Sequence, residues 1–192
     1  MSESDRLFVA PYHSDRTGTT CHIVRLEHRS EALIVDPVEM DAELYRLILN
    51  LGVDIVAVAI TNPEAIGAHA MHTLAKIYKL KVLSAASSVH GIATVSVREP
   101  QTVAGIELRA VPVRPFAPHA VMYLTHNVAF TGAIVHAGTI GASANEFAER
   151  LLIGILQDEL LAHDEIEVIV PSIGPPTTVQ AELHLSPHFR EH

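Results

Sequence analysis

The residues best suited to chemistry lie in one short corner of the chain, at positions 60–69, with the sequence ITNPEAIGAH. Asn62 and Glu64 could supply two oxygen ligands to a cation. The same residues also suit a helix start, because asparagine accepts hydrogen bonds at the N-cap and glutamate favours the positive helix end. Pro63 fits the first helical position. We therefore expect Asn62 to cap a helix, with cation binding as the alternative.

Histidines and one cysteine are the other candidates. The chain has 13 histidines, and histidine binds metals and exchanges protons near neutral pH. His69 and His72 lie three residues apart on an expected helix, but no third ligand accompanies them. Cys21 lies in an expected strand, where it is typically a small buried apolar residue. His22 follows it and should point to the opposite face of that strand. We therefore expect no cysteine–histidine pair from these two neighbours.

The elements that position these residues alternate between strands and helices. The nearly all-apolar run at 55–60 predicts a strand covered on both faces. Apolar periodicity after Asn62 predicts a helix to about Leu80, and Ser143 opens a capping box that predicts another. The remaining helices are expected at 41–51 and 177–185, and the remaining strands at 7–10, 21–26, 32–35, 81–83, 92–97, 106–113, 120–125, 128–130 and 166–170. Periodicity alone predicts a mixed α/β fold, and we expect residues 1–192 to form a single domain.

Five fragments resemble, in order, the signatures of the metallo-β-lactamase fold superfamily, closest to its glyoxalase II and persulfide dioxygenase branch. The fragments are ALIVDPV at 32–38, the corner led by Thr61, RPFAPH at 114–119, AFTGA at 129–133 and PSIGPPTT at 171–178. They are similar to a strand ending in Asp-Pro and to the patterns T-H-x-H-x-D-H, P-G-H-T-P-G, F-T-G-D and P-G-H-G-P. The resemblance spans residues 20–189. It implies a four-layer αββα sandwich of the metallo-β-lactamase type.

The resemblance also implies that the metal ligands of this superfamily are missing. The positions that match them hold Asn62, Glu64, Ile66, Gly67, Phe116, Ala133 and Ile173. The last five have no side chain that binds a metal, so we expect neither a metal nor another cofactor, and no catalytic residue at these positions. We expect Phe116 and Ile173 to fill the volume of the ions. Asp36 matches a residue that supports the corner, so we expect it to form structural hydrogen bonds.

Two functions from different classes remain open. The first is a pseudoenzyme, a non-catalytic binding, scaffold or regulatory module. The second is a hydrolase or thiol-directed enzyme similar to glyoxalase II, with a displaced site built from His119, His136, Glu64 or Cys21. His119 and His136 each lie three residues beyond a substituted ligand position. Together with Asp36 and Cys21, they are candidates to line the former pocket.

Composition limits the partners. Hydrophobic residues make up 48% of the chain and charged residues 18%, with a mean hydropathy of +0.27. This apolar balance favours a subunit interface, so we expect a homo-oligomer or a complex with an active paralogue. The net charge of −9 disfavours nucleic acid and anionic membranes as partners. Without an apolar run of membrane length or a signal-peptide pattern, a cytoplasmic protein is expected, and its small-molecule ligand stays open.

Overall fold

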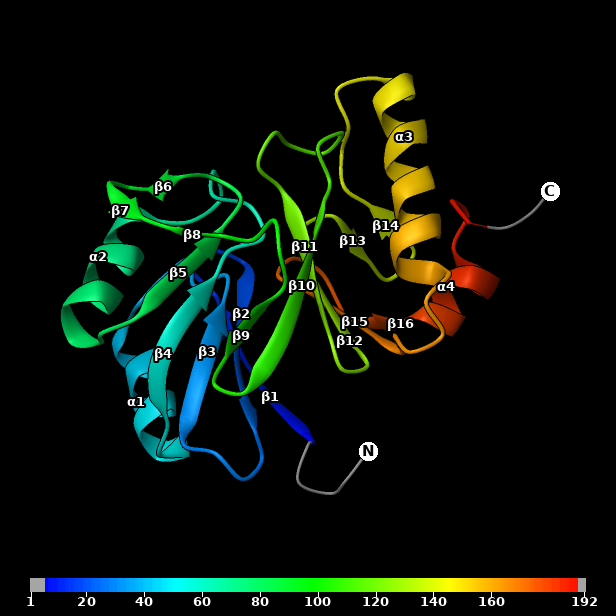
Figure 1. Cartoon of the computed structure of the whole chain (residues 1–192). Helices are drawn as coiled ribbons and strands as arrows, with labels where there is room; N and C mark the ends of the chain where they lie inside the picture. Colours follow the sequence, from blue (N-terminus) through cyan, green and yellow to red (C-terminus); the bar gives the residue numbers. More distant parts are fainter. Residues whose placement is uncertain (1–5, 190–192) are drawn as a thin grey trace.

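The computed structural model describes residues 6–189 as two six-stranded sheets packed face to face, with helices on both outer sides (Figure 1). In spatial order, the first sheet contains β1 (Leu7–Ser14), β2 (Thr19–Leu26), β3 (Glu31–Val35), β4 (Asp54–Ala59), β5 (Lys81–Ser84) and β8 (Val95–Ser96). The strands β1, β2 and β3 pair antiparallel, and β3, β4, β5 and β8 pair parallel. The parallel pairs β3–β4 and β4–β5 need crossovers, which α1 (Ala42–Leu51) and α2 (Ala68–Ile77) supply on the outer face.

The second sheet is mostly antiparallel. Its order is β16 (Thr177–Thr178), β15 (Val168–Pro171), β12 (Val128–Gly132), β11 (Val121–Thr125), β10 (Ile106–Pro112) and β9 (Gln101–Val103). The helices α3 (Glu146–Leu156) and α4 (Val179–Leu185) lie on its outer side (Figure 1). Two small hairpins complete the described chain, β6 (Ser88–Val89) with β7 (Ile92–Ala93) and β13 (Val135–His136) with β14 (Thr139–Ile140).

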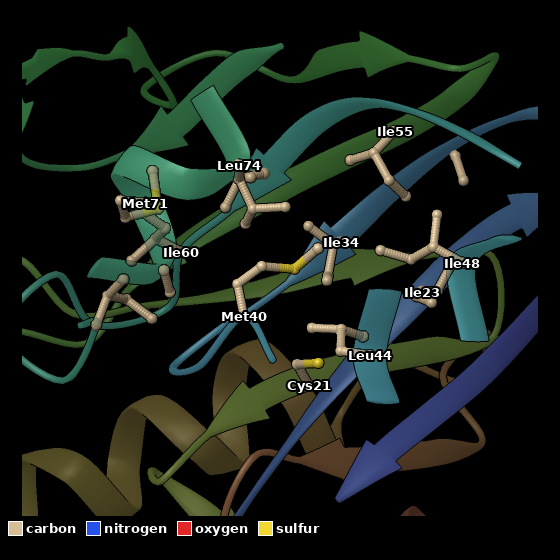
Figure 2. Close-up of a cluster of buried hydrophobic side chains, with 14 of the residues drawn as sticks. Cys21, Ile23, Ile34, Met40, Leu44, Ile48, Ile55, Ile60, Met71 and Leu74 are labelled. Carbon is tan, nitrogen blue, oxygen red and sulfur yellow. The ribbon is translucent and has the colours of Figure 1, made fainter. Parts of the chain in front are cut away.

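Three apolar clusters hold these four layers together. Figure 2 shows the cluster between α1, α2 and the first sheet, which includes Leu44, Met71 and Leu74. A second cluster lies between the sheets, and a third joins the second sheet to α3 and α4. The expected αββα sandwich is therefore confirmed.

Several expected element boundaries are confirmed and others are wrong. The helix α1 begins after Asp41, whose side chain accepts the N–H groups of Glu43 and Leu44, and ends at Gly52. The helix expected from Asn62 begins only at Ala68. The strand expected at 92–97 is divided between β7 and β8.

The helix expected from the capping box at Ser143 starts slightly later. Asn145 is the cap and accepts the N–H of Ala148 at 2.9 Å. The helix then continues beyond α3 as a π-helical turn, Gln157–Leu161, so its expected end near Ala162 is confirmed. Within residues 6–189, every helix is too short or too polar to cross a membrane.

Candidate functional site

The centre of the candidate site is Asp36, the residue that follows β3. Its Oδ1 accepts the backbone N–H of Thr61 at 2.7 Å, and its Oδ2 accepts the hydroxyl of Thr61 at 2.6 Å. The same Oδ2 accepts the hydroxyl of Ser172 at 2.5 Å. Thr61 lies just after β4 in the first sheet, and Ser172 lies just after β15 in the second. The Asp36 carboxylate therefore joins the two sheets at one end of the sandwich, which is the structural role expected for it.

Burial and hydrogen bonding act on Asp36 in opposite directions. Removal from water raises the pKa of its carboxyl, because the charged form loses hydration. The hydrogen bonds from Ser172 and Thr61 favour the charged form and reduce this rise. Asp36 also has a φ of 51°, a left-handed conformation in which aspartate is one of the more tolerated residues. A buried carboxyl held by three donors indicates a rigid point of the fold.

The turn at Gly132 completes this arrangement from the end of β12. Its carbonyl accepts the N–H of Ser172 at 2.7 Å. Its φ is 59°, and a Cβ atom there would collide with the side chain of Thr61. Only glycine lets the two sheets approach this closely at the site.

The corner at 61–67 forms a turn, and the expected helix start at Asn62 is wrong. The Asn62 side chain accepts the N–H of Glu64 at 3.2 Å, and its carbonyl accepts the N–H of Ala65 at 3.1 Å. These bonds stabilise a local turn, a role for which asparagine competes with helix capping. The N-cap of α2 is Gly67, which has no side-chain cap. A Cβ atom on Gly67 would lie 2.6 Å from the carbonyl oxygen of Val38, so the loop after β3 occupies the space of a side chain here.

A cavity of about 50 Å³ lies beside Asp36. Residues from four of the seven substituted ligand positions line it: Asn62, Ile66, Ala133 and Ile173. Among the described residues, Asp36 is the one ionisable side chain in the lining. Residues 6–189 contain no cluster of three or more His, Cys, Asp or Glu side chains arranged to hold a metal ion.

The residues present therefore do not fit the metal centre that the fold implies. A transition metal in a protein typically takes three or four nitrogen, sulfur or carboxylate ligands. Here both oxygens of the single carboxylate already accept protein hydrogen bonds, and the rest of the lining is mostly apolar or backbone.

The expectation that Phe116 fills the volume of the ions is corrected. Ile173 does line the cavity, with 44% of its surface exposed. Phe116 points elsewhere, and its ring packs against Gly141 and the cluster under α3. The cavity is narrowed instead by Thr61, Ile66 and the turn at Gly132.

The residues proposed for a displaced catalytic site lie apart. Cys21 is buried with Met40 and Leu44 under α1 (Figure 2), and burial raises the pKa of its thiol to about 12. The ring of His136 lies against Gly174. His119 lines a separate groove, and Glu64 is exposed. Of these candidate pocket residues, the structure places only Asp36 at the cavity.

The roles of two buried polar side chains, Tyr123 and His22, were not predicted from the sequence. The Tyr123 hydroxyl donates to the carbonyls of Ile60 at 3.2 Å and Leu83 at 3.1 Å, and so joins β11 to the first sheet. His22 packs its ring against Phe130 between the sheets, with ring centres 5.8 Å apart, and burial lowers its pKa to about 4. The available signal was their place in otherwise apolar strands, where a polar group has to be accommodated.

Comparison with known proteins extends this description. No family model and no curated protein matches the chain. Solved structures match it with low identity. A metallo-β-lactamase from Staphylococcus aureus subsp. aureus COL has a TM-score of 0.80 and 17% identity, over 98% of this chain and 64% of that one. The BLEG-1 B3 metallo-β-lactamase has a TM-score of 0.79 and 16% identity, over 96% of this chain and 100% of that one, and ETHE1 from Myxococcus xanthus has a TM-score of 0.78 and 16% identity, over 94% of this chain and 83% of that one. The chain thus spans less than two thirds of the Staphylococcus aureus protein. With its helix-flanked pair of sheets and these structural matches, the chain has the metallo-β-lactamase fold.

Proposed function

We propose that this chain is a non-catalytic protein of the metallo-β-lactamase fold that binds no metal and acts as a binding, scaffold or regulatory module. One observation carries the proposal. The cavity beside Asp36 has a single ionisable side chain in its lining, and both oxygens of that side chain already accept hydrogen bonds from Thr61 and Ser172. A metal would compete with these three donors for one carboxylate and would find no second charged ligand in the lining.

The loop after β3 also supports the proposal. The Val38 carbonyl lies where a side chain at position 67 would start, so a ligand at that position would require the loop to move. The Asp36 network then serves in place of an ion, because it connects the same loops with protein hydrogen bonds alone. Removing charged ligands together with their ion avoids a set of buried polar groups without partners.

Elemental analysis of purified protein tests the proposal. The full chain is produced in medium supplemented with zinc and iron, and we expect less than about 0.1 ion of either metal per chain. Because a metal bound only to the folded state raises the melting temperature, addition of EDTA should leave that temperature unchanged.

Stoichiometric zinc or iron would overturn the proposal and favour the enzyme alternative. In that case, thioester and persulfide substrates should be screened with the wild type and with His119→Ala. Loss of both metal and activity in the variant would locate a displaced site at His119. Co-purification with an active paralogue would indicate instead a subunit of a larger enzyme.

We also propose that the protein self-associates and works in a reducing compartment such as the cytoplasm. Its apolar composition supports self-association. Several large apolar side chains are exposed; Phe147, for example, exposes 68% of its surface. A single cysteine that cannot form an internal disulfide is typical of reducing compartments. Sedimentation velocity over a range of concentrations tests self-association, and a monomer throughout would contradict it.

A further inference from the structure

A groove separate from the Asp36 cavity lies between the edge of the first sheet and the corner that joins β10 to β11. Its volume is about 430 Å³, which falls in the range of small-molecule sites in proteins. One wall comes from β8 and the residues after it, and the other from residues 112–121 of the second sheet. Figure 1 shows the strands β8, β10 and β11 beside which these lining residues lie. No described residue lines both this groove and the cavity beside Asp36.

Two arginines line the groove, Arg98 from the first wall and Arg114 from the second. Neither guanidinium has a hydrogen-bond or ion-pair partner within residues 6–189. Several other arginines are paired, such as Arg16 with Glu39 and Arg109 with Glu159. No aspartate or glutamate of the described chain lines the groove. Two unpaired positive charges therefore share one concave surface of a chain whose net charge is −9.

The remaining lining is largely apolar. Val97 is buried, and Pro112 and Pro118 are rigid side chains that need no polar partner. His119 adds an imidazole that can form a further hydrogen bond. A ligand that suits this surface has an anionic group for the guanidiniums and a compact carbon skeleton for the apolar wall, because guanidinium pairs with carboxylate and phosphate through two parallel hydrogen bonds.

From these features we infer that the groove is a binding site for a small organic anion, a phosphate ester or a dicarboxylate, held by Arg98 and Arg114 from opposite walls. The site would give the module a ligand without using the former metal position. The inference does not depend on the proposed function, since it rests on different residues.

Isothermal titration calorimetry of the full chain at low ionic strength tests this inference, with glycerol phosphate and succinate as the two probes. We expect saturable binding of one ligand per chain for at least one probe, and the probe that binds distinguishes a phosphate ligand from a carboxylate ligand. Arg98→Gln and Arg114→Gln should each weaken binding at least about tenfold, because each removes one charged donor. Arg150→Gln is the matched control, since Arg150 is an exposed arginine on α3 outside the groove, and its affinity should stay within about twofold of wild type.

Several results would overturn the inference. One is the absence of saturable binding of either probe to the wild type at concentrations up to about 10 mM. Another is an equal loss of affinity in Arg150→Gln, which would indicate non-specific attraction to surface charge. Retained affinity in both groove variants would also overturn it. None of these results changes the metal content, so a failure here is distinguishable from a failure of the metal-free proposal.

Discussion

The cavity beside Asp36 and the groove beside Arg98 and Arg114 differ in whether their charged side chains already have hydrogen-bond partners. In the cavity, one buried carboxylate accepts three hydrogen bonds and leaves about 50 Å³ of space. In the groove, which has a volume of about 430 Å³, two exposed guanidiniums lack partners among the described residues. A buried carboxyl that accepts three hydrogen bonds has little acceptor capacity left for a ligand, whereas an unpaired charge at a concave surface can gain from binding one. The place where the fold suggests chemistry is thus the less suited of the two to bind anything.

Removal of the Asp36 carboxylate should have the largest effect on stability. Asp36→Ala takes away the acceptor of three buried donors, so we expect the free energy of unfolding to fall by about 3–5 kcal/mol. Urea denaturation measures this change. Asp36→Asn keeps one acceptor oxygen and should lose less. Wild-type stability in Asp36→Ala would show that the network does not hold the two sheets together.

Acid should destabilise the wild type through His22. Burial lowers the pKa of this imidazole to about 4 in the folded state, whereas in the unfolded chain it is about 6.5. Between pH 4 and 6.5 the folded state therefore binds fewer protons than the unfolded chain. The stability that depends on a neutral His22 is fully present above pH 6.5 and is lost as the pH falls toward 4. The loss should reach about 3 kcal/mol at most.

The variant His22→Leu should lack this part of the pH dependence, which urea denaturation at a series of pH values measures. His28→Leu is the matched control, because His28 is an exposed histidine in the turn after β2. Parallel pH profiles of the wild type and His22→Leu would contradict the argument.

The hydroxyl of Tyr123 should make a smaller contribution to the contact between the sheets. Tyr123→Phe removes one buried donor shared by the carbonyls of Ile60 and Leu83. We expect a loss of about 1–2 kcal/mol in the free energy of unfolding. Tyr45→Phe, at a side chain with 40% exposure on α1, should change stability by less than about 0.5 kcal/mol. Equal effects of the two changes would argue against a link through Tyr123.

The groove arginines should have the smallest effect on stability, even though they are expected to determine binding. Arg98→Gln and Arg114→Gln alter exposed side chains without partners, so each should shift the free energy of unfolding by less than about 0.5 kcal/mol. Thermal unfolding followed by circular dichroism measures this. A large loss of stability would mean that these guanidiniums support the fold, and would remove the contrast with Asp36.

The fold was predictable from the sequence because its elements follow local rules. The Asp41 cap, the apolar face of α1 and the terminal Gly52 all act within one helix. The strand at 55–60 is buried on both faces because it lies in the middle of the first sheet, as its apolar run indicates. The structural role of Asp36 followed from its position after a strand in the resembled motif.

The details of the site depended on contacts between distant parts of the chain, which local patterns do not show. The Asn62 side chain can cap a helix or stabilise a turn, and local sequence does not decide between the two. In the structure the turn is formed, and the Val38 carbonyl lies close to position 67, where glycine has no side chain. Phe116 was assigned to the cavity from its place in a motif, but its direction is fixed by Gly141, 25 residues later in the printed sequence. Arg98 and Arg114 were missed because they follow strands of different sheets, and Arg114, although it opens the fragment RPFAPH, matches no ligand position.

The outer strand β1 limits how copies of this protein can associate. It forms one edge of the first sheet and pairs on one side with β2 alone. Pro11 lies in the middle of this strand, opposite His22, and proline offers no N–H to an added strand. A second chain that tried to extend the sheet along this edge would meet an interrupted ladder. Continuous cross-chain β-structure along this edge is therefore disfavoured.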